Sequence, residues 1–209
     1  MSVLRRLREW RIDRQTDRLA RRPHGRRARA TYGADDAHSF LWEPVLTALA
    51  LEPDDRLLDV GCGGGAFLRH VAATVGCELA GLDHSRDMVR LTRARSPGLR
   101  VVRADAAATP FADGEFTAIS CLVAFFFFAD PVAVLRELRR VLAPGGRLAV
   151  MTTAPEAKGT EAAPYPLATR GHFHGDDELV ALARTAGYAS AGIAHREPWA
   201  QLLLASVQP

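Results

Sequence analysis

The sequence predicts a doubly wound α/β fold built on one sheet. Short apolar runs alternate with segments of helical periodicity through most of the chain, which is typical of strands joined by crossover helices. A glycine-rich turn, Gly61 to Gly65, closes the first strand and opens a helix. The last two strands, at residues 188–195 and 199–207, are joined by too few residues for a parallel crossover. We therefore expect a seven-stranded, mostly parallel sheet with an antiparallel C-terminal strand pair.

Periodicity and cap residues set the expected elements. Strands are expected at residues 56–60, 78–83, 99–104, 116–123, 147–152, 188–195 and 199–207. Helices are expected at residues 3–20, 38–50, 65–75, 85–95, 131–142 and 176–186. Ser85 is a typical N-cap, and Asp130 before Pro131 forms a cap and first-turn pair. A Pro-Gly-Gly run at residues 144–146 ends the helix that precedes the fifth strand.

The N-terminal segment differs in charge from the rest of the chain. Residues 1–30 hold 11 arginines and three acids, a net charge of +8, whereas the remainder holds 16 basic and 21 acidic residues, a net charge of −5. We divide the chain into a basic amphipathic arm with its linker, residues 1–30, and a domain, residues 31–209. A linker is expected at residues 21–33, because Pro23 and Gly25 interrupt the helical pattern there. One face of the arm helix carries Val3, Leu4, Leu7 and Trp10.

Composition argues against several classes of protein. Cys62, Cys77 and Cys121 are too scattered for a disulfide framework, and the lack of a CxxC pair argues against structural zinc, so no metal is expected. No apolar run approaches the ~20 residues of a membrane-spanning helix. Arginines interrupt the N-terminus too early for a secretory signal, and its acids argue against a transit peptide. We expect a cytoplasmic protein.

Acidic residues follow three of the predicted strands. Asp59, Asp83 and Asp105 each lie at or just after a strand's carboxyl end, where an open α/β sheet forms its ligand crevice. The glycine turn lets the backbone approach a ligand, and the helix after it favours an anionic group. Gly61, Gly63 and Ala66 also satisfy the relaxed dinucleotide fingerprint, so the turn by itself leaves a nicotinamide cofactor open.

Several segments of the chain form a recognisable set. They are residues 58–65 (LDVGCGGG), 81–85 (GLDHS) with Met88, 104–106 (ADA) with Pro110 and Phe111, 116–131, 138–148 (LRRVLAPGGRL) and 178–188. Together they resemble the class I methyltransferases, in particular the small methyltransferase-domain group that includes quinone and sterol C-methyltransferases, and the resemblance covers about residues 31–207. The resemblance implies a Rossmann-like sheet and S-adenosylmethionine as the methyl donor. An antiparallel terminal pair fits this family better than a dinucleotide fold.

The resemblance also implies roles in donor binding. Asp59 would lie near the methionine amino group or order the loop, Asp83 would bind the ribose hydroxyls, and Asp105 would accept from the adenine amino group. The other implied donor-binding residues are Tyr32, Gly61, Cys62, Gly63, His84, Ala106, Cys121 and Leu122. Two positions depart from the family pattern: Thr117 replaces a common Asp, and Phe126 replaces a common His.

Methyl transfer from a sulfonium needs mainly the correct positioning of acceptor and methyl group, with a base only where the acceptor loses a proton. His172 and His174 are the candidate catalytic bases, and loop histidines without a role are the alternative. Candidate substrate-binding residues are Phe125, Phe126, Tyr165 and Arg170. We expect the acceptor pocket between residues 125–128 and 165–174, with Tyr32 and the helix near His38 as a partial lid.

The expected function is methyl transfer from S-adenosylmethionine to a small, partly apolar acceptor by in-line displacement. RNA modification aided by the basic arm is an alternative, because arm charge attracts phosphate. A donor-binding module without catalysis is another, and a dinucleotide-dependent oxidoreductase is a third. The arm itself is expected to make at most weak contact with nucleic acid or a membrane surface.

Overall fold

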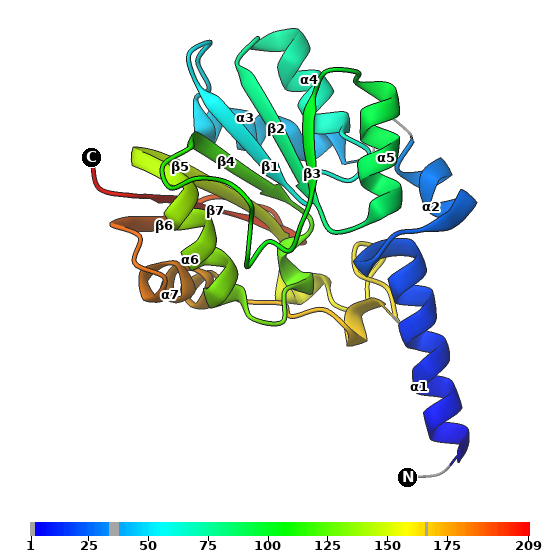
Figure 1. The fold of residues 1–209 in the computed structure, drawn as a ribbon. Helices are drawn as coiled ribbons and strands as arrows, with labels where there is room; N and C mark the ends of the chain where they lie inside the picture. The colour runs from blue at the N-terminus through cyan, green and yellow to red at the C-terminus, as the bar shows by residue number, and fades with distance from the viewer. Residues whose placement is uncertain (1–2, 34–37, 166) are drawn as a thin grey trace.

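The computed structural model describes residues 3–33, 38–165 and 167–209. Its centre is a seven-stranded sheet in the order β3-β2-β1-β4-β5-β7-β6 (Figure 1). Strands β1 to β5 pair in parallel, and β7 runs antiparallel to both of its neighbours, β5 and β6. The predicted α/β class and the antiparallel C-terminal pair are thereby confirmed. The strands are β1 (Arg56–Val60), β2 (Glu78–Asp83), β3 (Arg100–Arg103), β4 (Phe116–Leu122), β5 (Leu142–Thr153), β6 (Ser190–Arg196) and β7 (Ala200–Ser206).

Helices cover both faces of the sheet (Figure 1). On one face, α6 (Pro131–Val141) and α7 (Asp176–Thr185) pack against side chains such as Leu58 and Val60. On the other face, α3 (Trp42–Leu49), α4 (Ala66–Thr74) and α5 (Arg86–Arg95) pack against side chains such as Leu57. Because successive strand residues point to opposite faces, each central strand supplies both cores, as its continuous apolar sequence predicts.

The N-terminal arm is folded further than the sequence predicts. Helix α1 (Val3–Thr16) continues into a π-helical segment (Asp17–Arg21), and a second helix, α2 (Gly25–Thr31), follows. The interpretation of residues 21–33 as a linker is therefore corrected. Pro23 ends the first helical stretch and Gly25, with φ of 80°, begins the next, so these residues mark a turn between helices. The division of the chain near residue 30 stays a prediction.

A hydrogen-bonded network joins β1, β4 and β5 on the side of the sheet where β1 and β4 begin. The Thr117 hydroxyl donates to Asp55 Oδ1 at 2.6 Å and accepts the backbone N–H of Arg56 at 2.9 Å. Arg147 donates to both oxygens of Asp55, at 2.6 and 3.0 Å, and also to the carbonyls of Leu49 and Ala50.

This network sets the charge state of Asp55. Burial opposes its ionisation, but hydrogen bonds from Arg147 and Thr117 outweigh burial and lower the pKa of Asp55 from 3.8 to about 2. Thr117, which departs from the family pattern, thus has a structural partner. No helix among the described residues is long and apolar enough to cross a membrane.

We expect Arg147→Met to lower the free energy of unfolding by about 2–3 kcal/mol at pH 7, because it leaves the Asp55 carboxylate buried without its cation. The Asp55 pKa is depressed in the folded state, so its stabilisation is present above pH 3.8 and is lost as the pH falls towards about 2. The destabilisation caused by Arg147→Met should therefore shrink as the pH falls from 3.8 towards about 2. Urea denaturation at several pH values measures it, with exposed Arg136→Met as the control. An equal loss in both variants would contradict the assignment.

Candidate functional site

A cavity of about 1080 Å³ opens at the carboxyl ends of the central strands. The sheet order makes β1 and β4 neighbours, with β2 and β3 on one side and β5 on the other. Strand order therefore reverses at this point, which is where open α/β sheets form their ligand crevice. Residues from the loops after β1, β2, β3 and β4 line the cavity, together with residues of the arm.

The loop after β1 has no space for side chains at its glycines. Gly61 and Gly63 have φ angles of 75° and 52°, in the left-handed region that glycine adopts at least cost. A Cβ atom on Gly61 would lie 2.6 Å from the Cβ of Ala124. A Cβ atom on Gly64 would lie 2.0 Å from the carbonyl oxygen of Tyr32. The loop therefore presents backbone to the cavity, and glycine is needed at these positions.

Asp83, the last residue of β2, connects two loops. Its Oδ2 accepts the backbone N–H of Gly63 at 2.9 Å, and its Oδ1 accepts the backbone N–H of Ser85 at 2.7 Å. Burial raises the pKa of Asp83, and the two backbone donors oppose that effect. Since a carboxylate offers about four acceptor positions, Asp83 retains capacity for hydroxyl donors of a ligand.

Asp59 in β1 lies directly across from Ser120 in β4. The Ser120 hydroxyl donates to Asp59 Oδ1 at 2.7 Å, and both residues are buried. Burial raises the pKa of Asp59 from 3.8 to about 7; the Ser120 hydrogen bond opposes this, and the charge of nearby Asp83 adds to it. Two neighbouring buried carboxyl groups favour a cationic ligand, since a cation would stabilise both as carboxylates.

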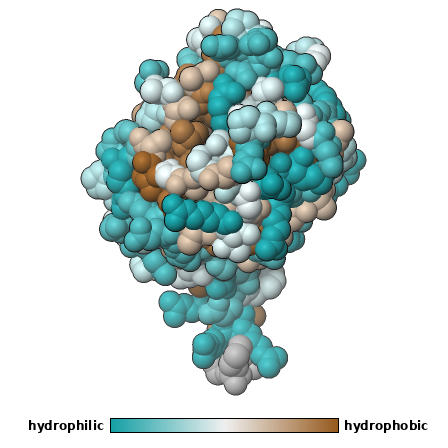
Figure 2. Space-filling view, turned by 90° about the vertical axis from the view of Figure 1, so that its left-hand side faces the viewer, coloured by the Kyte–Doolittle hydropathy of each residue, from teal (hydrophilic) through white to brown (hydrophobic). Residues whose placement is uncertain are grey.

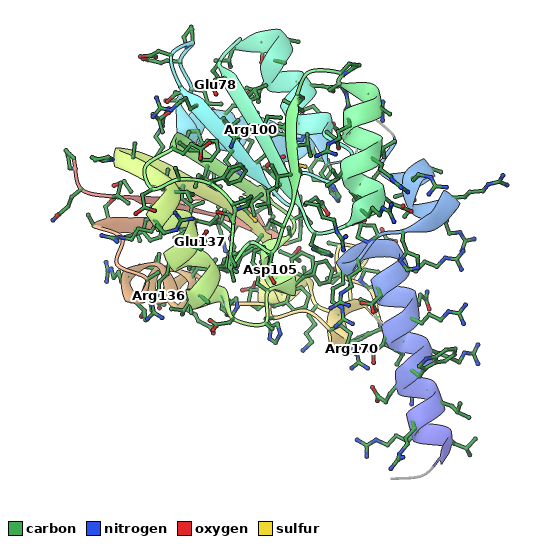
Figure 3. All side chains as sticks on the ribbon, in the orientation of Figure 1. Glu78, Arg100, Asp105, Arg136, Glu137 and Arg170 are labelled. Carbon is green, nitrogen blue, oxygen red and sulfur yellow. The ribbon has the colours of Figure 1, made fainter. Side chains whose placement is uncertain are left out.

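The third predicted acid lies at the rim of the cavity. Asp105 is exposed, and its Oδ1 accepts the backbone N–H of Ala107 at 2.9 Å. Figure 3 shows Asp105 below the end of β3, towards the middle of the molecule. His84, which is exposed, and Ala106, which is buried, line the same cavity. The structure thus brings the three carboxylates and the glycine turn together around one cavity.

Tyr32 and the arm form another part of the wall. The Tyr32 ring lies against Gly63, and its backbone lies against Gly64. Burial, with a contribution from the charge of Asp83, raises the pKa of Tyr32 to about 12. The Ser85 hydroxyl donates to the carbonyl of Pro23 at 2.5 Å, which fixes the chain between α1 and α2 beside α5.

An aromatic surface lines the cavity where the loop after β4 meets α3. Phe126 is stacked on Phe173, with ring centroids 5.4 Å apart, and its carbonyl accepts the His172 backbone N–H at 2.7 Å. Val123 has a φ angle of 55°, which is rare for a β-branched residue and costs about 1–3 kcal/mol. The aromatic residues that line the cavity are Tyr32, Trp42, Phe67, Phe126, Phe127 and Phe128.

His38 borders the same cavity, at the start of the segment that leads into α3. Its ring lies 6.4 Å from the ring of Phe40, measured between centroids. His38 is exposed at the edge of the cavity, and partial desolvation by its surroundings lowers its pKa. The imidazole is therefore neutral near pH 7 and has a nitrogen available to accept a proton.

Two residues expected at the cavity lie in the core instead. Cys121 is fully buried among residues that face α6 and α7, because it alternates with Ser120 and Leu122 on β4. Phe125 is also fully buried, against Phe128 and the ring of His174. Leu122 and Phe126 do line the cavity, as expected.

The predicted polar cluster of residues 165–174 is likewise not part of the cavity wall. His172 is exposed, and only its backbone reaches Phe126. The His174 Nδ1 lies 2.8 Å from a carboxylate oxygen of Glu178, and the His174 ring packs against the ring of the buried Phe125. Tyr165 is exposed beside Gly159, and Arg170 forms ion pairs with the acids of α1. The structure thus gives these four side chains partners or solvent, and the acceptor pocket expected beside them is corrected.

Sequence reasoning did not identify several residues of the wall. Trp42 belongs to the predicted helix, but its direction depends on how α3 packs. Arg22 and His24 line the cavity because the arm folds back towards α5, and nothing local in the sequence signals that contact. In the part of the chain that the structure describes, no cluster of three or more His, Cys, Asp or Glu residues is arranged to hold a metal ion.

Comparison with known proteins matches the part of the chain that contains the glycine turn and the strand-end acids. A family model described as a methyltransferase domain matches residues 58–150. The chain is 32% identical over 168 residues to a ubiquinone biosynthesis O-methyltransferase of Xanthomonas axonopodis pv. citri, covering 71% of this chain and 70% of that protein. It is 39% identical over 135 residues to a demethylmenaquinone methyltransferase of Thermus thermophilus, covering 62% of this chain and 60% of that protein.

The sequence similarity covers only part of some relatives, whereas the similarity in fold covers most of the chain. The chain spans only 44–60% of the length of four demethylmenaquinone methyltransferases that it matches. The fold is similar to that of an S-adenosylmethionine-dependent methyltransferase from Aquifex aeolicus, with a TM-score of 0.70 and 21% identity over 86% of this chain and 98% of that one.

We expect Asp59→Asn to flatten the pH dependence of stability in the ligand-free protein. The Asp59 pKa is raised to about 7 in the folded state, so its contribution to stability is full below pH 3.8 and is lost as the pH rises through about 7. The asparagine side chain keeps an acceptor for the Ser120 hydroxyl and does not ionise. Above pH 7 the variant should be more stable than the wild type, by on the order of 2–4 kcal/mol.

Urea denaturation between pH 5 and pH 8 measures this difference, with the exposed carboxylate variant Asp54→Asn as the control. Parallel stability curves for Asp59→Asn and the wild type would contradict the elevated pKa.

Proposed function

We propose that this chain, which belongs to the class I S-adenosylmethionine-dependent methyltransferases, transfers a methyl group to a small, partly apolar acceptor. The observation that carries the proposal is the cavity at the carboxyl ends of the strands, where a glycine turn and three strand-end acids meet. The antiparallel strand β7 and the two quinone-related relatives support methyl transfer over a dinucleotide cofactor or an RNA acceptor.

The residues of the cavity fit S-adenosylmethionine as the donor. That molecule carries an ammonium, a sulfonium, two ribose hydroxyls and an adenine amino group. Asp59 and Asp83 are buried acids that complement the cationic and hydroxyl groups, and Asp105 supplies an acceptor at the rim. Gly61, Gly63 and Gly64 add no side chains to the cavity wall, so the turn presents backbone there. A volume of about 1080 Å³ accommodates a donor together with a small acceptor.

Within this proposal the donor-binding roles follow from position. Asp83 accepts from the ribose hydroxyls while it holds Gly63 and Ser85. Asp59 accepts from the amino group of the methionine part, next to Gly61, Cys62 and Gly63. His84, Asp105 and Ala106 border the adenine, and Tyr32 with Leu122 closes the donor region.

The donor supplies a methyl group that is already activated by its positively charged sulfur. This chain's residues need to hold the acceptor at near-attack distance and keep water away, which contributes roughly 7–11 kcal/mol to catalysis. Phe126 is held rigidly by Phe173 and by the His172 backbone, so it presents a fixed apolar surface. Phe127, Phe128 and Trp42 extend that surface. This aromatic wall suits a flat ring.

The acceptor that we favour is a hydroxylated aromatic ring of the quinol type. Relatives are named demethylmenaquinone methyltransferase and ubiquinone biosynthesis O-methyltransferase, and both names describe quinone-type acceptors. Transfer to such a ring, at oxygen or carbon, removes a proton from the acceptor. His38 is a neutral imidazole on the cavity wall and is the residue that we propose accepts it, in place of His172 or His174.

Binding and transfer assays test this function together. Calorimetry should detect S-adenosylhomocysteine but not NAD, and Asp83→Ala should weaken that binding by about 1.5–3 kcal/mol for each lost hydrogen bond to the carboxylate. Labelled S-adenosylmethionine should pass its methyl group to a quinol-type acceptor and not to RNA. Tight NAD binding without binding of the adenosyl ligand would overturn the proposal, and donor binding without transfer to any acceptor would leave a binding module instead.

His38→Ala should lower turnover by about 10²–10⁴-fold, the typical contribution of a general base. The affinity for S-adenosylhomocysteine should change little. The wild-type rate should rise with pH through a titration below the ordinary imidazole pKa of 6.5, and the variant should lack that rise. His172→Ala is the matched control, since both imidazoles are exposed but only His38 lines the cavity. Full activity in His38→Ala with an unchanged pH profile would leave positioning as the whole mechanism.

A further inference from the structure

Helix α1 turns its polar side towards the domain. Between Leu4 and Thr16, the residues that are not exposed are Glu9, Ile12, Asp13 and Thr16, at the spacing of one helical face. Arg170 donates to Glu9 at 2.5 Å and to Asp13 at 2.6 Å. Figure 3 shows Arg170 beside α1. Both acids of α1 are therefore already paired on the side that meets the domain.

The opposite side of α1 is apolar and cationic. Leu4, Leu7 and Trp10 are 79%, 53% and 56% exposed, although a helix packed on its own domain normally buries such residues. Arg8, Arg11 and Arg14 lie among them and are exposed. Arg14 stacks over the Trp10 ring at 5.2 Å. Within the described residues, none of these three arginines forms an ion pair with a carboxylate.

The helix also projects from the body of the molecule. Figure 1 shows α1 running away from the sheet, with its N-terminal end farthest from the domain. In Figure 2 the arm extends below the rest of the molecule. The exposed side is thus accessible along the helix to a large, flat partner.

We propose that the face formed by Leu4, Leu7, Trp10, Arg8, Arg11 and Arg14 docks on the surface of an anionic lipid membrane. Arginines complement the negative lipid headgroups, and leucine with tryptophan inserts at the boundary between headgroups and acyl chains. Trp is the side chain that most favours this boundary, because its ring is apolar and its N–H is polar.

Charge and composition favour lipid over the other partners. A second copy would bring the same unpaired arginines face to face, which is repulsive. A nucleic acid would pair with the arginines but would leave two exposed leucines without an apolar partner. A lipid surface satisfies both kinds of side chain at once.

Membrane docking would specify the substrate class of the proposed function, and this step rests on that function. The last two residues of the π-helical segment after α1 and the three that follow it, Ala20 to His24, line the cavity. A membrane bound to α1 would therefore lie near the cavity, and an apolar ring with a lipid-soluble tail could enter without crossing water. The substrate class that this favours is a membrane-dissolved, hydroxylated aromatic compound.

Vesicle sedimentation tests the docking with the full chain. Vesicles of phosphatidylcholine alone are compared with vesicles that contain about one third phosphatidylglycerol, at low and physiological ionic strength. The wild type should sediment with the anionic vesicles only. Leu4→Ala with Leu7→Ala and Trp10→Ala should weaken the partitioning by about tenfold or more. Arg11→Gln with Arg14→Gln should weaken it too, while the matched pair Arg26→Gln with Arg27→Gln on α2 should have a smaller effect.

Each other outcome counts against the docking. Absence of binding to anionic vesicles overturns it, as does wild-type partitioning by the triple alanine variant. Steeply salt-dependent binding to RNA that survives the alanine substitutions, without vesicle binding, would make the arm a nucleic-acid contact. The affinity for S-adenosylhomocysteine is measured in every variant and should be unchanged. A wild type that binds the donor but no vesicles would therefore refute this inference alone, whereas a wild type that does not bind the donor would refute the proposed function.

Discussion

The carboxylate of Asp83 accepts backbone N–H groups from Gly63 and Ser85, and the rest of the site depends on that arrangement. The hydrogen bonds join the turn after β1 to the start of α5. The turn is further fixed because the N–H groups of Gly61 and Cys62 donate to the carbonyl of Leu82. Since the glycines of the turn carry no side chains that could hold it by packing, these backbone contacts determine its shape. The same strand end also anchors the arm, through the hydrogen bond from Ser85 to Pro23.

The cost of this arrangement is two carboxyl groups buried beside each other. Burial raises the free energy of the Asp59 carboxylate, the charge of nearby Asp83 adds to that cost, and the pKa of Asp59 is raised as a result. A cationic ligand relieves it, so the unfavourable charge of the ligand-free cavity becomes binding energy for a sulfonium or ammonium compound. The aromatic wall at the loop after β4 has the opposite character, which separates a charged region from an apolar one within a single cavity.

The charged residues of the arm differ between its domain side and its outer side. The acids of α1, Glu9 and Asp13, pair with Arg170. Asp87 of α5 accepts both the Gly25 N–H and the Arg29 guanidinium of α2. These contacts orient α1 and α2 from the domain side. What remains on the outer side is arginine and apolar surface. The orientation of the arm thus separates its two sets of charges, although its sequence mixes them.

The sequence by itself determined the strand and helix order, the antiparallel final pair, the glycine turn and the three strand-end acids, because each rests on local periodicity or on backbone chemistry that acts over a few residues. Only the tertiary structure decided which side chains share the cavity. Cys121 and Phe125 face the core because strand alternation and the turn after β4 rotate them away, and Arg170 meets α1 instead of a substrate. Trp42 and His24 reach the wall through the packing of α3 and the arm, a contact between segments that lie far from the strand ends in sequence. Such contacts depend on the whole arrangement of layers, and no local pattern encodes them.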